Sequence, residues 1–179
     1  EPMITLLAVW MLSIPADGPV NELRPDGLVV DWITLGPFPT RPLERRLPDG
    51  VNRSGYHTDF LKELGGEANA VLRPDTAVTI TTPEGHKRIV KAQRVGPAFE
   101  SMKLPLFNHI LEERHIIEED YNQAVGYGFC YLKSMRDQKV YGYLGFNDSP
   151  KVWLNGKLIH QVWEDERQAF MWQDGIVLD

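Results

Sequence analysis

The hydrophobic positions of the chain fall mainly into short runs that are rich in β-branched and aromatic residues. Runs of this kind, separated by turns that contain Gly, Pro, Asn or Asp, are typical of β-strands. We expect strands over residues 28–35, 77–82, 87–95, 125–132, 139–146 and 151–160. The second and third runs, joined by a turn that contains Gly85, predict a hairpin. The pattern as a whole predicts an all-β fold.

The last of these runs has the most specific local signal. Asn155 and Gly156 occupy the two central positions of a hairpin turn, and both residue types tolerate the positive φ that a type I′ turn requires. The resulting register pairs residues 154 with 157, 153 with 158 and 152 with 159. We therefore expect Trp153 to be a core residue.

Two of the expected strands have features that predict their place in the fold. The first is followed by Gly-Pro-Phe-Pro at residues 36–39, and because each proline removes a backbone donor, we expect the strand to leave the sheet there. The run over residues 139–146 is apolar on both faces. That pattern favours a strand in the middle of a β-sandwich.

One segment has helical rather than strand periodicity. Within residues 59–64 the apolar side chains share one helical face, Asp59 can serve as N-cap, and Gly65 can end the helix. We expect one short helix.

Charge and cysteine content narrow the classes of partner and of chemistry. The 19 basic and 25 acidic side chains give a net charge of −6 without a basic block. A nucleic-acid backbone as partner requires a basic face, so this class is disfavoured. Cys130 is the only cysteine, which rules out an intrachain disulfide, and its apolar surroundings predict a buried, inert thiol.

The N-terminal residues 3–15 are almost wholly apolar and have two open interpretations. Their length suits a secretory signal or its remnant, and it falls short of the roughly 20 residues that a membrane span needs. The alternative is a first strand buried in the fold. We accordingly divide the chain into residues 1–18, a signal remnant or linker, and residues 19–179, the folded domain.

The residue types that carry catalysis show no catalytic arrangement in this sequence. The five histidines lack metal-ligand spacings, and Ser54 and Ser134 lack the context of a nucleophile elbow. The glutamate pairs at residues 112–113 and 118–119 are typical of a solvated surface. The sequence therefore predicts that the protein is not an enzyme.

Several motifs, taken in order, resemble the galactose-binding-like jelly-roll modules of secreted or surface bacterial proteins. The most specific is a Gly-x-Asn-Asp loop that leads into a Val-Trp-Leu-Asn-Gly hairpin. The chain departs from the pattern by ending near where a final pair of strands is expected and by carrying Ser-Pro after the loop. The matching segments are residues 32–39, 59–61, 65–67, 127–132 and 144–157.

The resemblance implies a jelly-roll β-sandwich in a larger, extracytoplasmic, polysaccharide-processing protein. It also implies a noncatalytic module whose loops bind a glycan through aromatic faces and a few polar groups. A structural spacer that packs against other domains of a longer chain is the alternative, because a fold does not fix a function. The candidate ligand-binding residues are Glu67, Asn147, Asp148, Trp163, Arg167 and Trp172.

No cofactor is expected from the sequence. Jelly rolls of this kind sometimes hold a structural calcium ion, and Asn147 and Asp148 carry the oxygen ligands that calcium prefers. A calcium site at this loop is therefore the one metal site that the resemblance leaves open.

Overall fold

The protein is described by a computed structural model that covers residues 20–22, 27–39, 55–81, 85–95, 124–146, 149–164 and 173–179. About half of these residues lie in strands, and their one helical segment is a single 3-10 turn, η1 (Lys62–Leu64). The expected all-β character is confirmed. The N-terminal apolar run over residues 3–15 and the glutamate pairs lie outside the described residues.

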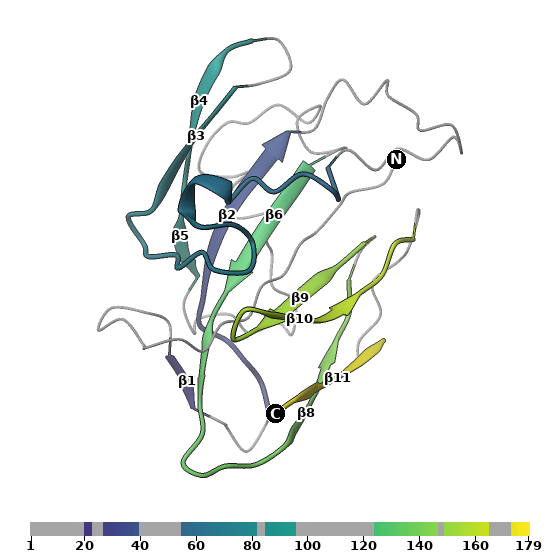
Figure 1. Cartoon of the computed structure of the whole chain (residues 1–179). Coiled ribbons are helices and arrows are strands. Elements are labelled where there is room, and N and C mark those ends of the chain that lie inside the picture. The colour runs from purple at the N-terminus through teal and green to yellow at the C-terminus, as the bar shows by residue number, and fades with distance from the viewer. Residues whose placement is uncertain are drawn as a thin grey trace.

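The strands form small sheets of two or three members (Figure 1). The largest has the order β5-β2-β6 and is antiparallel, with β2 spanning Trp32–Pro39, β5 Gln93–Val95 and β6 Ala124–Phe129. Every described side chain of β2 and β6 is buried, so this sheet lies in the middle of the molecule.

The described part of the chain forms four further strand pairs beside this central sheet. Three are antiparallel, and the pair β1–β7 is parallel. The pairs are β1 (Val20–Glu22) with β7 (Tyr131–Lys133), β3 (Ala77–Thr81) with β4 (Lys87–Lys91), β9 (Lys151–Leu154) with β10 (Lys157–Gln161), and β8 (Val140–Leu144) with β11 (Asp174–Leu178).

Among the described residues two hydrophobic clusters form the core, and β2 and β9 each contribute side chains to both clusters. Successive side chains of a strand point to opposite faces. Ile33 and Trp153 accordingly belong to the first cluster, and Trp32 and Val152 to the second. The core position expected for Trp153 is confirmed. Cys130 is buried in the second cluster, where burial raises the pKa of its thiol, as expected for an unreactive cysteine.

The prediction that the first strand ends before the prolines is wrong, because β2 continues through both of them. Its register with β6 shifts between Leu35, which pairs with Tyr127, and Phe38, which pairs with Val125. One extra residue of β2 is thus accommodated as a bulge. A bulge is one of the few places where a sheet tolerates a proline, and this explains the difference.

Both predicted hairpins are confirmed, with one correction of register. β3 and β4 pair as expected, and Asn155 (φ 51°) and Gly156 (φ 81°) form the turn between β9 and β10. The first two pairs of the predicted register hold. Val152, however, pairs with His160 and not with residue 159, because a bulge follows Leu158. The predicted register assumed that the residues pair one to one, and the bulge adds one residue to β10.

The expected short helix is reduced to η1. Gly65 (φ 98°) ends it as predicted, donating its backbone N–H to the carbonyl of Lys62. Asp59 does not cap η1 but accepts instead from the backbone N–H of Leu61 at 2.9 Å and of Glu67 at 3.2 Å. These bonds hold the chain in turns before and after η1, and such local bonds compete with a longer helix.

The prediction that both faces of residues 139–146 are buried is also wrong. Among the described residues β8 pairs with β11 alone, and its two tyrosines, Tyr141 and Tyr143, are 71% and 61% exposed. The opposite face holds Gly142, against which the side chain of Ile176 packs. Tyrosine is amphipathic, so an apolar pattern that includes it does not require burial.

Candidate functional site

A buried polar network joins the segment of residues 55–72, here called the site loop, to the strands below it. The Glu67 carboxylate accepts a hydrogen bond from the Tyr127 hydroxyl of β6 at 3.0 Å. Its other oxygen lies 3.5 Å from Nζ of Lys151 on β9, and the side chains of this ion pair are only 11% and 12% exposed. Three parts of the chain thus meet at one carboxylate.

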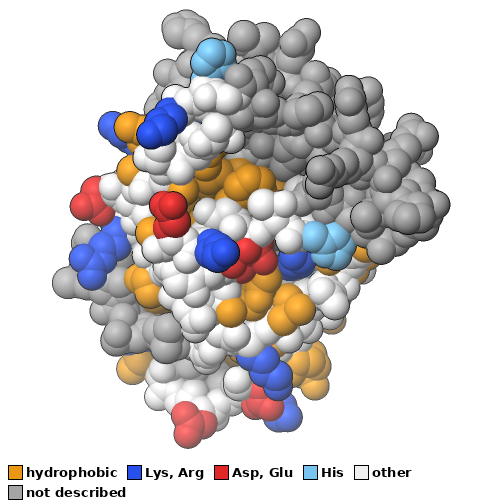
Figure 2. Space-filling model, turned by 45° about the horizontal axis from the view of Figure 1, so that its top comes forward, with side chains coloured by type: hydrophobic (Ala, Val, Ile, Leu, Met, Phe, Trp, Pro, Cys, Tyr) orange, Lys and Arg blue, Asp and Glu red, His pale blue; other side chains and the backbone are white. Residues whose placement is uncertain are grey.

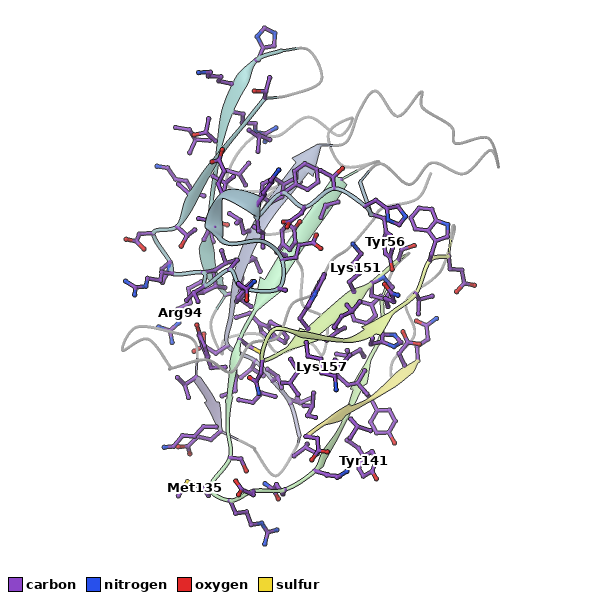
Figure 3. All side chains as sticks on the ribbon, viewed as in Figure 1. Tyr56, Arg94, Met135, Tyr141, Lys151 and Lys157 are labelled. Carbon is purple, nitrogen blue, oxygen red and sulfur yellow. The ribbon has the colours of Figure 1, made fainter. Side chains whose placement is uncertain are left out.

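Lys151 also holds the start of the site loop. Its ammonium group donates to the backbone carbonyl of Tyr56 and lies 4.5 Å from the centre of the Tyr56 ring. Figure 3 shows these two side chains close together above β9. The ammonium group therefore has an anionic partner, a carbonyl partner and an aromatic partner, which is how a buried lysine is stabilised.

The site loop is held in place by its own polar groups. Asp59 accepts hydrogen bonds from two backbone N–H groups of the loop. In addition, Phe60 donates its backbone N–H to the Tyr127 hydroxyl at 3.3 Å. Gly66 has φ 87°, and a Cβ there would lie 2.9 Å from an oxygen of Asp59. Glycine adopts this positive φ without strain, whereas any other residue here would be strained and would have to displace the Asp59 carboxylate.

An aromatic group lies next to this network. The Trp163 ring meets the Tyr56 ring edge to face, with centroids 4.9 Å apart, and the His57 ring lies 6.2 Å from that of Trp163. Tyr56 is buried, Trp163 is partly buried and His57 is exposed. Figure 2 shows charged side chains of both signs near the middle of the visible face, with hydrophobic side chains beside them. We call Tyr56, His57 and Trp163 the aromatic group.

Burial governs the titration of the network. It raises the pKa of the Glu67 carboxyl, and Lys151 and the hydrogen bond from Tyr127 lower it in part. Burial and the charge of Glu67 raise the pKa of Tyr56 to about 12 and that of Tyr127 well above its ordinary value. Both tyrosines therefore remain protonated hydrogen-bond donors at neutral pH.

The structure brings together two of the six residues that the sequence predicted for ligand binding. Glu67 and Trp163 lie on either side of Tyr56 and Lys151. The other predicted residues, Asn147, Asp148, Arg167 and Trp172, lie outside the described residues. Lys151, Tyr56 and Tyr127 were not predicted, because each has an apolar or turn-forming neighbourhood and no sequence motif indicates that a lysine points inward.

Within the described segments no three His, Cys, Asp or Glu side chains are grouped so as to hold a metal ion. The predicted calcium loop at Asn147 and Asp148 is outside these segments. None of the helical structure that is described is long and apolar enough to cross a membrane.

The raised pKa of Glu67 predicts a pH dependence of stability. The folded carboxyl keeps its proton to a higher pH than the unfolded one, whose reference pKa is 4.5, so folding binds protons in this window. The stability that Glu67 contributes is thus present below pH 4.5 and lost as the pH rises through its folded pKa.

Urea unfolding of the wild type and of Glu67→Gln, from about pH 4 to about pH 7, measures this contribution. The free energy of unfolding of the wild type, relative to the variant, is expected to fall as the pH rises. A difference that stays constant or increases would contradict the assignment.

Comparisons with known proteins add no relative to this description. No protein-family model matches the chain, and neither the curated proteins nor the solved structures that were compared with it gave a match. The resemblance to galactose-binding-like modules therefore remains a prediction from the sequence motifs, and the site geometry is the basis for a functional proposal.

Proposed function

We propose that the protein is a noncatalytic carbohydrate-binding module of a larger, extracytoplasmic protein that processes polysaccharides. In this proposal its small sheets belong to a jelly-roll sandwich, with the glycan bound at the site loop. The observation that carries it is the aromatic group, in which Trp163 packs edge to face on Tyr56 beside an exposed His57. Aromatic faces next to polar groups suit the CH-rich faces and hydroxyls of a sugar.

The buried network supports this proposal by holding the aromatic group rigid. Lys151 fixes the backbone of Tyr56, and the ion pair with Glu67 fixes Lys151. A rigid site binds more tightly because little conformational freedom is lost when the ligand arrives. In this proposal Glu67 acts as a positioning residue, because its oxygens already have partners within the chain.

A glycan-array screen of the purified protein with a Trp163→Ala variant tests the proposal. We expect the wild type to bind a defined set of glycans and the variant to bind them about tenfold more weakly, since it lacks the largest ring of the site. Met135→Ala is the matched control, because Met135 is 87% exposed and lies outside the aromatic group. Equal binding by wild type and Trp163→Ala would place any glycan elsewhere.

A structural spacer domain is the second candidate. It is favoured by the same network, because Glu67 and Lys151 satisfy each other and are almost inaccessible to a ligand. If this alternative holds, the folded wild type binds nothing on the array, and Trp163→Ala lowers the melting temperature without any other effect.

A further inference from the structure

The outer face of the β8–β11 pair carries an aromatic surface that the site loop does not include. Tyr141 and Tyr143 are 71% and 61% exposed, and Val177, opposite Tyr141, is 47% exposed. Opposite Tyr143 stands Gly175, whose missing Cβ would lie 3.7 Å from Cε1 of the tyrosine. We call these four residues the tyrosine face. Figure 3 shows Tyr141 projecting away from the ribbon, well below Tyr56 in this view.

The geometry of the tyrosine face suits an extended ligand. Residues two apart in a strand lie on the same face, about 7 Å from each other. This separation is larger than one pyranose ring, so a single sugar cannot stack on both Tyr141 and Tyr143. Because Gly175 has no side chain, the ring of Tyr143 can lie close to the sheet at this position.

As far as the described residues define it, the tyrosine face is small for a protein partner. Two strands of five residues span about 17 Å by about 10 Å, or on the order of 170 Å². A stable protein interface buries about 800 Å² on each partner. A narrow chain can be bound by a strip of this width, whereas a second folded protein needs several times the area.

The charges beside the tyrosine face indicate a neutral ligand. An exposed ion pair joins Lys139, next to β8, and Asp179, next to β11, at 3.0 Å, and both side chains are more than 60% exposed. Their opposite charges cancel, so the face neither attracts nor repels a charged ligand strongly. Both groups can still exchange hydrogen bonds with hydroxyls.

We infer that the tyrosine face binds a flat, neutral polysaccharide chain, with consecutive sugars stacked on Tyr141 and Tyr143. This inference rests on the carbohydrate-binding function proposed above and adds a second surface and a ligand class to it. The site loop and the tyrosine face are separate, so each can be removed without the other.

Isothermal titration of the whole protein with cellohexaose, a flat neutral chain, tests the inference, with glucose and maltohexaose as comparison ligands. We expect cellohexaose to bind, glucose to bind too weakly to measure, and Tyr141→Ala/Tyr143→Ala to weaken cellohexaose binding at least about tenfold. Tyr141→Phe/Tyr143→Phe keeps both rings and should bind nearly as the wild type does. Ile89→Ala, at a 59% exposed strand position on β4, should change nothing.

Chemical-shift mapping on the wild type gives a second measurement that needs no variant. Added cellohexaose should shift the backbone amide signals of β8 and β11. Unshifted signals there, or full cellohexaose binding by the double alanine variant, would overturn the inference while leaving the proposed function intact.

Three other outcomes also decide the question. A wild type that binds other glycans but not cellohexaose would overturn the tyrosine face alone. A wild type that binds no glycan at all would overturn the proposed function and this inference together. Self-association that the double alanine variant abolishes would identify a second copy of the chain as the occupant.

Discussion

Replacing Lys151 with methionine is expected to lower the free energy of unfolding by about 3 kcal/mol at neutral pH. Methionine retains the length and the packing of the lysine stem but removes the ammonium group. The carboxylate of Glu67, 89% buried as a side chain, would then lack its cationic partner, and the carbonyl of Tyr56 would lose its donor. A buried charge without compensation costs far more than a surface pair contributes.

Urea unfolding measures this effect, and the chain offers a matched control. Lys133 and Glu22 form an ion pair at 3.3 Å, but their side chains are 48% and 73% exposed. Lys133→Met should therefore lower the free energy of unfolding by less than about 1 kcal/mol.

A double variant separates the ionic effect from a packing effect. Glu67→Gln/Lys151→Met removes both charges, so it should recover much of the stability that Lys151→Met loses. If Lys151→Met costs no more than Lys133→Met, the network is not the buried ion pair described above.

Replacing Gly36 with alanine is expected to cost about 3 kcal/mol of stability. Gly36 lies in the bulge of β2 with φ 153°, and a Cβ there would be 3.1 Å from the Cα of Gly126 and 3.1 Å from the carbonyl oxygen of Val125. Both contacts are to the backbone of the neighbouring strand β6, which would have to shift by a few tenths of an ångström within the closely packed central sheet.

Gly85→Ala is the control that separates the clash from the conformational strain. Gly85 also has a positive φ, 85°, but nothing lies within 4 Å of its missing Cβ. We expect Gly85→Ala to cost about 1 kcal/mol, from strain alone. Thermal or urea unfolding of both variants measures the difference, and equal costs would show that close approach to β6 is unimportant.

The local predictions succeeded where a few neighbouring residues determine the backbone. Asn155 and Gly156 adopt the positive φ angles that the turn requires, and Gly65 ends η1 in the left-handed region. These outcomes depend on steric limits within one or two residues, and such limits act in the same way whatever the rest of the chain does.

The predictions about neighbours failed because they depended on which strand packs where. The prolines of β2 were expected to end it, yet a bulge against β6 accommodates them. The apolar run of β8 was expected between two layers, yet Tyr141 and Tyr143 are exposed. The residues of a strand do not by themselves specify which strand pairs with it at a bulge. Nor do they specify which of its two faces is buried.

The candidate site was likewise predicted only in part. Glu67 and Trp163 were predicted from the sequence as site residues. The residues that contact them were not predicted: Lys151, Tyr56 and Tyr127. Tyr127 is separated from Glu67 by 60 positions in the chain. Contacts over such distances follow from the packing of whole sheets, which single-sequence patterns do not specify.

The all-β character, the two hairpins and the burial of Trp153 and Cys130 were thus predictable, because side-chain periodicity, turn chemistry and hydrophobicity specify them. The course of β2, the exposed face of β8 and the ion pair between Glu67 and Lys151 depend instead on tertiary contacts. Each of these depends on the free energy of a contact between residues far apart in the chain, so only the folded arrangement could specify it.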